Sequence, residues 1–231
     1  MLPDWSQRSW LYTRKFSLSF WVRQRRTPPL QKRVASSSGV RFIQRARERS
    51  RRFDLPAWYA VILLVLGSDE IPAGILEAAA FHQSISDSLQ PIDSSALKLD
   101  RIRRLAQQIP TDRMLTFCSK VKLRNGVIRH IPMMDFHCPV SDHSLAVVSK
   151  TAAMFGIGPG FVLQTEKSYH FYGTQLVSET ELVRFLSQAL LFSPIVDQAW
   201  IAHQLIDMCC ALQISSRRPK SRVPKVVGFI E

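Results

Sequence analysis

The spacing of apolar residues changes at Arg113, and this change constrains the fold more than any other feature of the chain. Alternate positions from there on fall on Leu115, Phe117, Ser119, Val121 and Leu123. A period of two is typical of a strand with one buried face. The dipeptide Asn125-Gly126 follows directly and favours a tight turn between antiparallel strands. Residues from 113 onward are therefore predicted to begin an antiparallel sheet.

The rest of this region alternates short strands with helices. The chain returns as a strand over Val127–Phe136, where Pro132 cannot donate to a ladder and indicates an edge or a bulge. Further strands are expected at Phe161–Gln164, Ser168–Gly173 and about Ala211–Ser215. Helices are expected after Ser141-Asp142, after the capping box Ser178 to Glu181, and after Asp197. The pattern predicts an α+β core over residues 111–231, with an antiparallel RRM-like sheet and helices on one face.

Residues 53–110 form an expected helical accessory unit that precedes this core. A first helix begins near Asp54 and ends at Gly67, and a second short one runs from about Asp69 to His82. A third helix spans Ser94–Ile109 and stops at Pro110. The first two helices are predicted to pair as a helical hairpin.

The positive charge lies almost entirely in the first 52 residues. The chain carries a net charge of +13, and residues 1–52 hold 14 Lys and Arg against only Asp4 and Glu48. Three interpretations stay open for this basic, aromatic-rich tail: an arm that binds nucleic-acid phosphates and bases, an organelle transit peptide, or a disordered extension that includes an overlong start.

The longest apolar run, Ala57 to Gly67, is about half the roughly 20 residues that a bilayer requires, so no membrane span is expected. The four cysteines form no Cys-x-x-Cys pair, which argues against a zinc knuckle or a thioredoxin motif. They are expected to be small buried apolar residues. We expect a cytoplasmic protein, with an organelle as the alternative compartment.

Polar residues interrupt apolar stretches at three points in a fixed order. The interruptions are Asp135-Phe136-His137, then Ser168-Tyr169-His170, then Asp197. Asp135 and His137 are two apart on a strand and could face one pocket, which a carboxylate from elsewhere, Asp197, would complete. Each residue also has a purely structural explanation: a turn or cap for Asp135, a loop position for His137, a satisfied strand histidine for His170, and a helix cap for Asp197.

These motifs resemble the catalytic core of the archaeo-eukaryotic primase superfamily, which includes small primase-polymerases. The resemblance covers residues 113–218 and rests on Met133-Met134-Asp135-Phe136-His137, Ser168-Tyr169-His170-Phe171-Tyr172-Gly173 and Ile195-Val196-Asp197. It implies that Asp135, His137 and Asp197 lie at a site for divalent Mn²⁺ or Mg²⁺. It also implies that Asp135, Asp197 and His170 are catalytic and that Ser168, His170 and Tyr172 bind nucleotide.

One position departs from that pattern, because His137 replaces the second acid of the first motif and imidazole suits Mg²⁺ poorly. A basic segment with Arg217, Arg218 and Lys220 offers a surface for nucleic acid. We therefore expect a primase-like nucleotidyltransferase that uses nucleoside triphosphate and DNA or RNA in replication or repair. The alternatives are a catalytically inactive nucleic-acid-binding module of the same fold and a basic-tailed protein-interaction adaptor.

Overall fold

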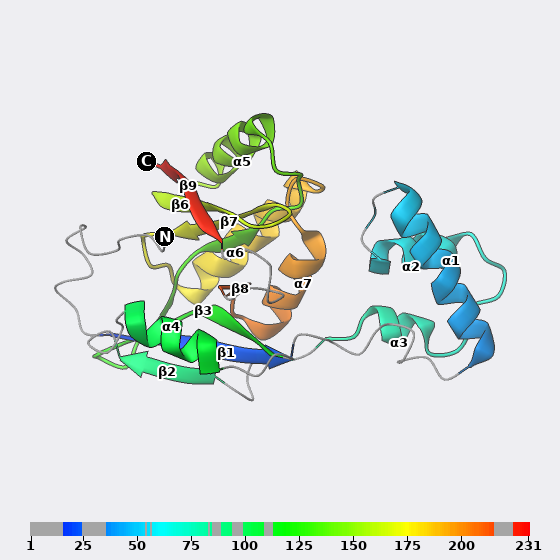
Figure 1. Cartoon of the computed structure of the whole chain (residues 1–231), viewed down its shortest axis with the longest axis horizontal. Helices are drawn as coiled ribbons and strands as arrows, with labels where there is room; N and C mark the ends of the chain where they lie inside the picture. Colours follow the sequence, from blue (N-terminus) through cyan, green and yellow to red (C-terminus); the bar gives the residue numbers. More distant parts are fainter. Residues whose placement is uncertain are drawn as a thin grey trace. The chain divides into compact units, whose positions relative to one another are not determined.

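The computed structural model describes residues 16–24, 36–53, 55, 57–82, 84, 89–93, 99–108, 113–214 and 224–231. Two compact units make up the chain, divided between Arg25 and Arg26 and again between Gln83 and Ser84. The larger unit carries the strands, and the smaller unit, within residues 26–83, is helical (Figure 1). In the part of the chain that is described, no helix is both long and apolar enough to cross a membrane.

The smaller unit contains α1 (Ser37–Phe53), α2 (Ala57–Leu66) and α3 (Ile75–Ala79). Ser36 caps α1 by accepting a hydrogen bond from the Gly39 amide at 3.1 Å, which satisfies one of the otherwise unpaired amides of the first turn. The apolar face of α1 packs on α2 and α3, and their buried side chains form one cluster: Phe42, Ile43, Ala46, Ala60, Val61, Leu64, Ile75 and Ala78. Two of the three expected accessory helices are thus present, and they share their core with α1.

The first sheet of the larger unit has the order β2-β1-β3-β4, with β8 also paired to β3. Its strands are β1 (Phe16–Gln24), β2 (Leu89–Asp93), β3 (Arg113–Leu123), β4 (Ile128–His130) and β8 (Ala211–Gln213), all antiparallel to their neighbours. Helix α4 (Leu99–Gln108) packs on this sheet, with Ile102 and Leu105 against Leu115 and Val121. The third expected helix therefore belongs with the sheets rather than with the accessory helices.

Strand β1 and all of helix α1 except Phe53 lie within residues 1–52, for which a disordered extension was one of the three interpretations. Phe16, Leu18, Phe20 and Val22 occupy alternate positions in β1, a period of two that the basic composition of the tail obscured. Helix α1 forms because an apolar stripe runs through its arginines. The described part of this stretch is therefore structured, and the boundary expected at residue 53 is not the one at which the compact units divide.

The second sheet has the order β5-β7-β6-β9 and is also antiparallel. Its strands are β5 (Met133–Asp135), β6 (Gly160–Gln164), β7 (Tyr169–Gly173) and β9 (Lys225–Ile230). The single return strand expected over Val127–Phe136 is divided between the two sheets as β4 and β5, with Ile131-Pro132 between them. Pro132 has no amide to donate, so the chain changes sheets where a ladder bond is unavailable.

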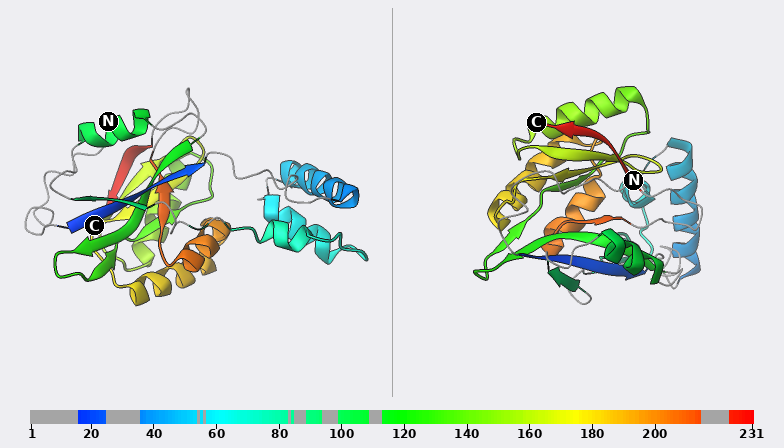
Figure 2. Two further views of the ribbon diagram at one scale, coloured as in Figure 1. Left: turned by 90° about the horizontal axis from the view of Figure 1, so that it is seen from below. Right: turned by 60° about the vertical axis from the view of Figure 1, so that its left-hand side comes forward.

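Three further helices and a short 3₁₀ turn complete the larger unit: α5 (Asp142–Met154), α6 (Glu179–Ala189), η5 (Leu190–Phe192) and α7 (Gln198–Asp207). The predicted cap at Ser141 and the predicted capping box of Ser178 and Glu181 are both present. Helix α5 lies on the side of the second sheet away from the first sheet (Figure 2). The α+β class and the antiparallel pairing are thus confirmed, with the strands arranged in two sheets.

Candidate functional site

Asp135 and Asp197 lie next to each other although 61 residues separate them in the sequence. The segment before α7 runs antiparallel to the end of β5, and Phe136 and Val196 form a bridge. The Asp197 amide donates to the Asp135 carbonyl at 2.9 Å, and the His137 amide donates to the Ile195 carbonyl at 2.7 Å. These two backbone bonds flank the bridge, so the neighbouring positions of the two aspartates are set by main-chain pairing.

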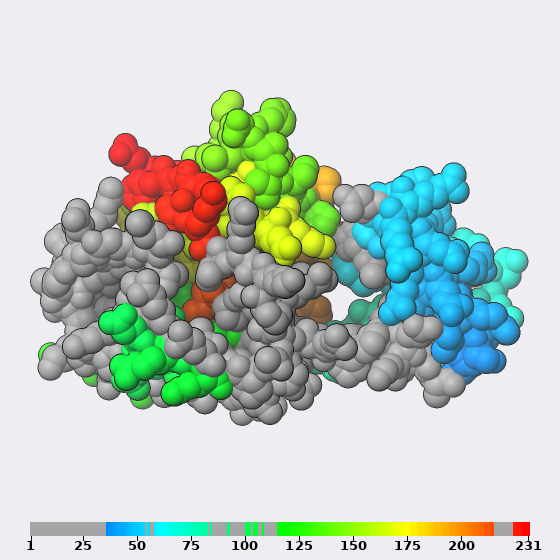
Figure 3. Space-filling model, viewed as in Figure 1, coloured from blue at the N-terminus to red at the C-terminus, as the bar shows by residue number. Residues whose placement is uncertain are grey.

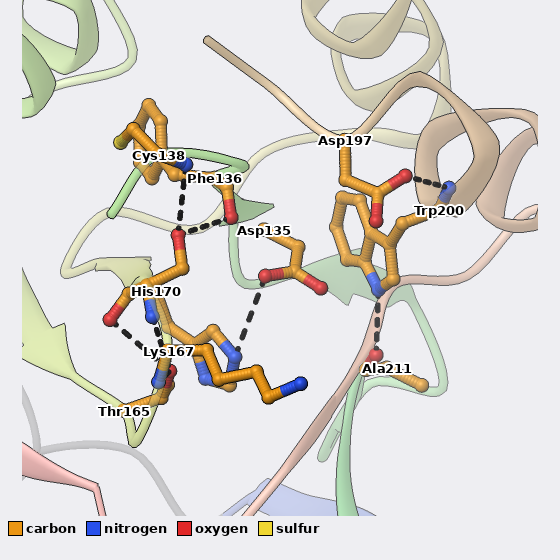
Figure 4. A network of polar contacts seen from close by, with 10 residues as sticks. Asp135, Phe136, Cys138, Thr165, Lys167, His170, Asp197, Trp200 and Ala211 are labelled. Atoms are coloured by element: carbon orange, nitrogen blue, oxygen red, sulfur yellow. Dashed lines mark hydrogen bonds and ion pairs between the residues drawn. The ribbon is translucent and has the colours of Figure 1, made fainter. Parts of the chain in front are cut away.

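Asp197 is also the N-cap of α7. One of its carboxylate oxygens, Oδ1, accepts a hydrogen bond from the Trp200 amide at 2.9 Å. Figure 4 shows the other oxygen turned toward the side on which Asp135 lies. Trp200 is fixed in turn, because its indole Nε1 donates to the Ala211 carbonyl at 3.0 Å. Asp197 can therefore cap α7 and bind a cation at the same time, because a carboxylate has enough lone pairs for both.

His170 of β7 lies directly opposite Asp135 of β5 in the sheet register. Its Nε2 is 3.5 Å from Asp135 Oδ1 (Figure 4). Burial lowers the pKa of His170 to about 4, because a charged imidazolium would lose its hydration. The ring is therefore neutral at neutral pH, and its second nitrogen, Nδ1, is buried without a hydrogen-bond partner among the described residues.

Tyr172 shares the face of β7 with His170, because residues two apart on a strand point to the same side. Tyr169, on the opposite face, instead donates its hydroxyl to the Ser141 carbonyl at the start of α5. The Tyr172 ring stacks on Phe117 of the first sheet at 6.2 Å between centroids. Burial and the nearby Asp135 carboxylate raise the pKa of Tyr172. The face that carries Asp135, His170 and Tyr172 is thus turned toward the first sheet.

Ser168 binds the backbone that follows Asp135. Its hydroxyl donates to the Phe136 carbonyl and accepts from the Cys138 amide at 3.2 Å, and its own amide donates to Thr165 Oγ1 at 3.0 Å. These bonds hold the loop after β5 against the turn between β6 and β7. The structure therefore gives Ser168 a positioning role, and its predicted contact with nucleotide stays a prediction.

Two further polar residues, His137 and Lys167, come from segments next to this site, and only His137 was selected from the sequence. His137, predicted to share the pocket with Asp135, has an exposed side chain. Lys167, which the sequence analysis did not select, extends from the β6–β7 turn toward the side of His170 and Asp135 (Figure 4). Nothing in the sequence singles out Lys167 as a functional residue, because exposed lysines are common in turns.

The predicted metal site, the cysteines and the basic C-terminal segment remain to be located in the structure. Among the described residues, no three His, Cys, Asp or Glu side chains lie together in a way that could hold a metal ion. All four cysteines are free thiols, and Cys118, Cys209 and Cys210 are buried as predicted, whereas Cys138 is half-buried. Arg217, Arg218 and Lys220, the predicted nucleic-acid contacts, lie outside the described residues.

Residues 93–226 match the family described as AEP-like, archaeo-eukaryotic primase 1D-like. The chain belongs to this family. The matched region contains β5, β7 and the N-cap of α7, and so includes Asp135, His170 and Asp197. No curated protein and no solved structure matches the chain. The resemblance noted from the three short motifs is therefore confirmed at the level of the family.

Proposed function

We propose that this primase-like chain is a nucleotidyltransferase domain that binds a nucleoside triphosphate through a divalent cation and acts on DNA or RNA in replication or repair. The observation that supports this best is the main-chain pairing of Asp135 with Asp197, with His170 opposite Asp135 in the register. Two carboxylates beside a buried, neutral imidazole form a donor set suited to a cation and its phosphate ligands.

The cation would be held by Asp135 and Asp197. Mg²⁺ and Mn²⁺ keep several waters and bind substrate phosphates, so they do not require a cage built wholly from protein groups. Two carboxylates fit that requirement, and they are consistent with the absence of a three-residue cluster among the described residues. When bound, the cation would neutralise charge on the triphosphate and polarise its phosphoryl oxygens. His137 is exposed and is not needed for this arrangement.

His170 would contact the phosphates from the floor of the site. A neutral ring has a single N–H, and Nε2 is the nitrogen that faces Asp135. Once the cation holds the Asp135 carboxylate, this N–H would donate to a phosphate oxygen. Lys167 would add a positive charge at the rim, where it remains hydrated until the triphosphate arrives. Ser168 would act indirectly, by holding the backbone after Asp135 in place. Tyr172 would lie beside His170, since the two rings are neighbours on the same face of β7.

A second candidate function is a catalytically inactive, nucleic-acid-binding descendant of the same fold. The specific observation in its favour is His137, which stands where the resemblance implies a second acid and whose side chain is exposed. A site with one fewer negative charge binds a hard cation more weakly and cannot hold two in the usual way. Both functions require the described fold, so only an activity measurement separates them.

Incorporation of labelled nucleotide on a single-stranded template, in Mn²⁺ and in Mg²⁺, makes that separation. The proposed activity predicts incorporation by the wild type and a loss of at least about a hundredfold in Asp135→Asn, which removes one ligand charge without changing side-chain size. Asp142→Asn is the matched control, because Asp142 is an exposed acid in the first turn of α5. Template binding without incorporation by any variant would instead support the inactive module.

A further inference from the structure

Helix α1 carries an unusual density of arginine on its exposed side. Its 17 residues include six arginines, no lysine and a single acid, Glu48. Arg41, Arg45 and Arg49 are spaced by four and are all exposed, so their side chains follow one side of the helix. At a rise of 1.5 Å per residue, this row extends over about 12 Å. Figure 3 shows atoms of α1, in blue, at the surface.

The apolar side of the same helix is already covered. Phe42, Ile43 and Ala46 are buried against α2 and α3 within the smaller unit. An amphipathic helix that lies on a membrane must insert its apolar face among the lipids, and α1 has no such face left to insert. What the arginine side of α1 offers to a partner is charge and hydrogen-bond donors.

The charge of this row is not neutralised by the parts of the unit that the structure describes. Among the described residues, no ion pair joins Arg41, Arg45 or Arg49 to a carboxylate. Guanidinium groups form bidentate hydrogen bonds with phosphate, and a row of them is opposite in charge to the phosphate backbone of a nucleic acid. Arginine in place of lysine throughout α1 fits recognition of phosphate geometry as well as of charge.

We propose that the exposed arginine row of α1, defined as Arg41, Arg45 and Arg49, binds the phosphate backbone of a nucleic acid. This surface belongs to the helical unit and is separate from the Asp135 site of the sheet unit. It reads no base sequence, because contacts to phosphate position a protein without specifying a base. The inference does not depend on the proposed catalytic function: a domain with no nucleotidyltransferase activity would still bind through α1.

The test is the salt dependence of duplex DNA binding by the full chain, followed by fluorescence anisotropy between about 50 and 200 mM salt. Each phosphate contact contributes roughly 0.9 to the slope of log K against log salt concentration. The triple variant Arg41→Gln, Arg45→Gln, Arg49→Gln is expected to lower the magnitude of that slope by about 3. A matched control removes three exposed charges from other helices: Arg101→Gln, Lys150→Gln and Arg184→Gln.

The same experiment includes outcomes that would overturn the proposal. An unchanged slope in the α1 variant, or an equal decrease in the control, would mean that the arginine row does not contact phosphate. Binding to phosphatidylserine vesicles that depends on the row, with DNA binding unaffected, would assign the surface to membranes instead. The variant with all three arginines changed to lysine should keep the slope, which separates lost charge from lost folding. Duplex binding is measured without nucleotide and without a divalent cation, so failure of the catalytic proposal would remain distinguishable.

Discussion

Acidification from pH 7 to pH 5 should destabilise the larger unit through two buried histidines. His130 and His170 are both buried, and desolvation lowers the pKa of each to about 4, from an ordinary value of about 6.5. Between those values the unfolded chain binds protons that the folded chain excludes, so stability falls as the pH falls. Integrated from pH 7 to pH 5, each histidine removes about 2 kcal/mol from the free energy of unfolding, or about 4 kcal/mol together.

Urea unfolding followed by circular dichroism at both pH values measures this loss. His130→Asn is the informative variant, because the amide can replace Nδ1, which lies 3.1 Å from Ser119 Oγ, without a titrating ring. Its loss between pH 7 and pH 5 should be smaller than that of the wild type by about 2 kcal/mol. Titration of the two rings by NMR should place both midpoints well below 6.5. Equal pH dependence in the wild type and in His130→Asn would show that His130 is not a source of the loss.

Substitutions at three further positions test the cation ligand, the first motif and the packing of β6 separately. Asp197→Asn should keep the hydrogen bond to the Trp200 amide and the stability of the fold but lose metal-dependent nucleotide binding, whereas Asp197→Ala should also lose about 1 kcal/mol of unfolding free energy in urea. Equal nucleotide binding by Asp197→Asn and the wild type would contradict the role of Asp197 as a cation ligand. His137→Asp introduces a second acid into the first motif and should strengthen Mg²⁺ binding in the presence of nucleotide, measured by calorimetry. An unchanged Mg²⁺ affinity would mean that position 137 is remote from the site. Gly160→Ala should destabilise the fold by about 2 kcal/mol, because the new Cβ would lie 2.3 Å from the Phe171 ring and 2.7 Å from the Tyr172 carbonyl. Stability equal to that of the wild type in urea unfolding would show that β6 can shift to make room for the methyl group.

Local signals in the sequence predicted the helices of the larger unit well. Ser141, the capping box of Ser178 and Glu181, and Asp197 each begin a helix where expected, because a cap depends on residues three positions apart. Strand alternation and Asn125-Gly126 likewise predicted the turn that follows β3. These features are local, so a single sequence contains the information for them.

The division into two sheets and the pairing of β1 could not be predicted in the same way. Strand β1 joins β3 across about 90 residues, and neither strand indicates its partner by its own pattern. The period of two in Phe16–Val22 was present but was obscured by the surrounding arginines. Strand partners are selected by tertiary packing, which a local pattern does not specify.

The candidate site was predicted in its residue types and only partly in its geometry. The order of Asp135, His170 and Asp197 along the chain was sufficient to predict that the three residues form one site. Their actual meeting depends on the bridge between Phe136 and Val196 and on the register of β5 with β7. The bonds of Ser168 to the backbone and the stacking of Phe117 on Tyr172 could not be predicted, because both join segments far apart in the sequence.

Calorimetry of Mn²⁺ binding, with and without a non-hydrolysable nucleoside triphosphate, tests whether Asp135 and Asp197 hold a cation together with the nucleotide. We expect the wild type to bind the cation tightly only when the nucleotide is present. Asp135→Asn should lose this coupled binding, while the exposed control Asp142→Asn should keep it. Coupled binding that survives in Asp135→Asn, or its absence from the wild type, would contradict the assignment of Asp135 and Asp197 as the cation ligands of a primase-like site.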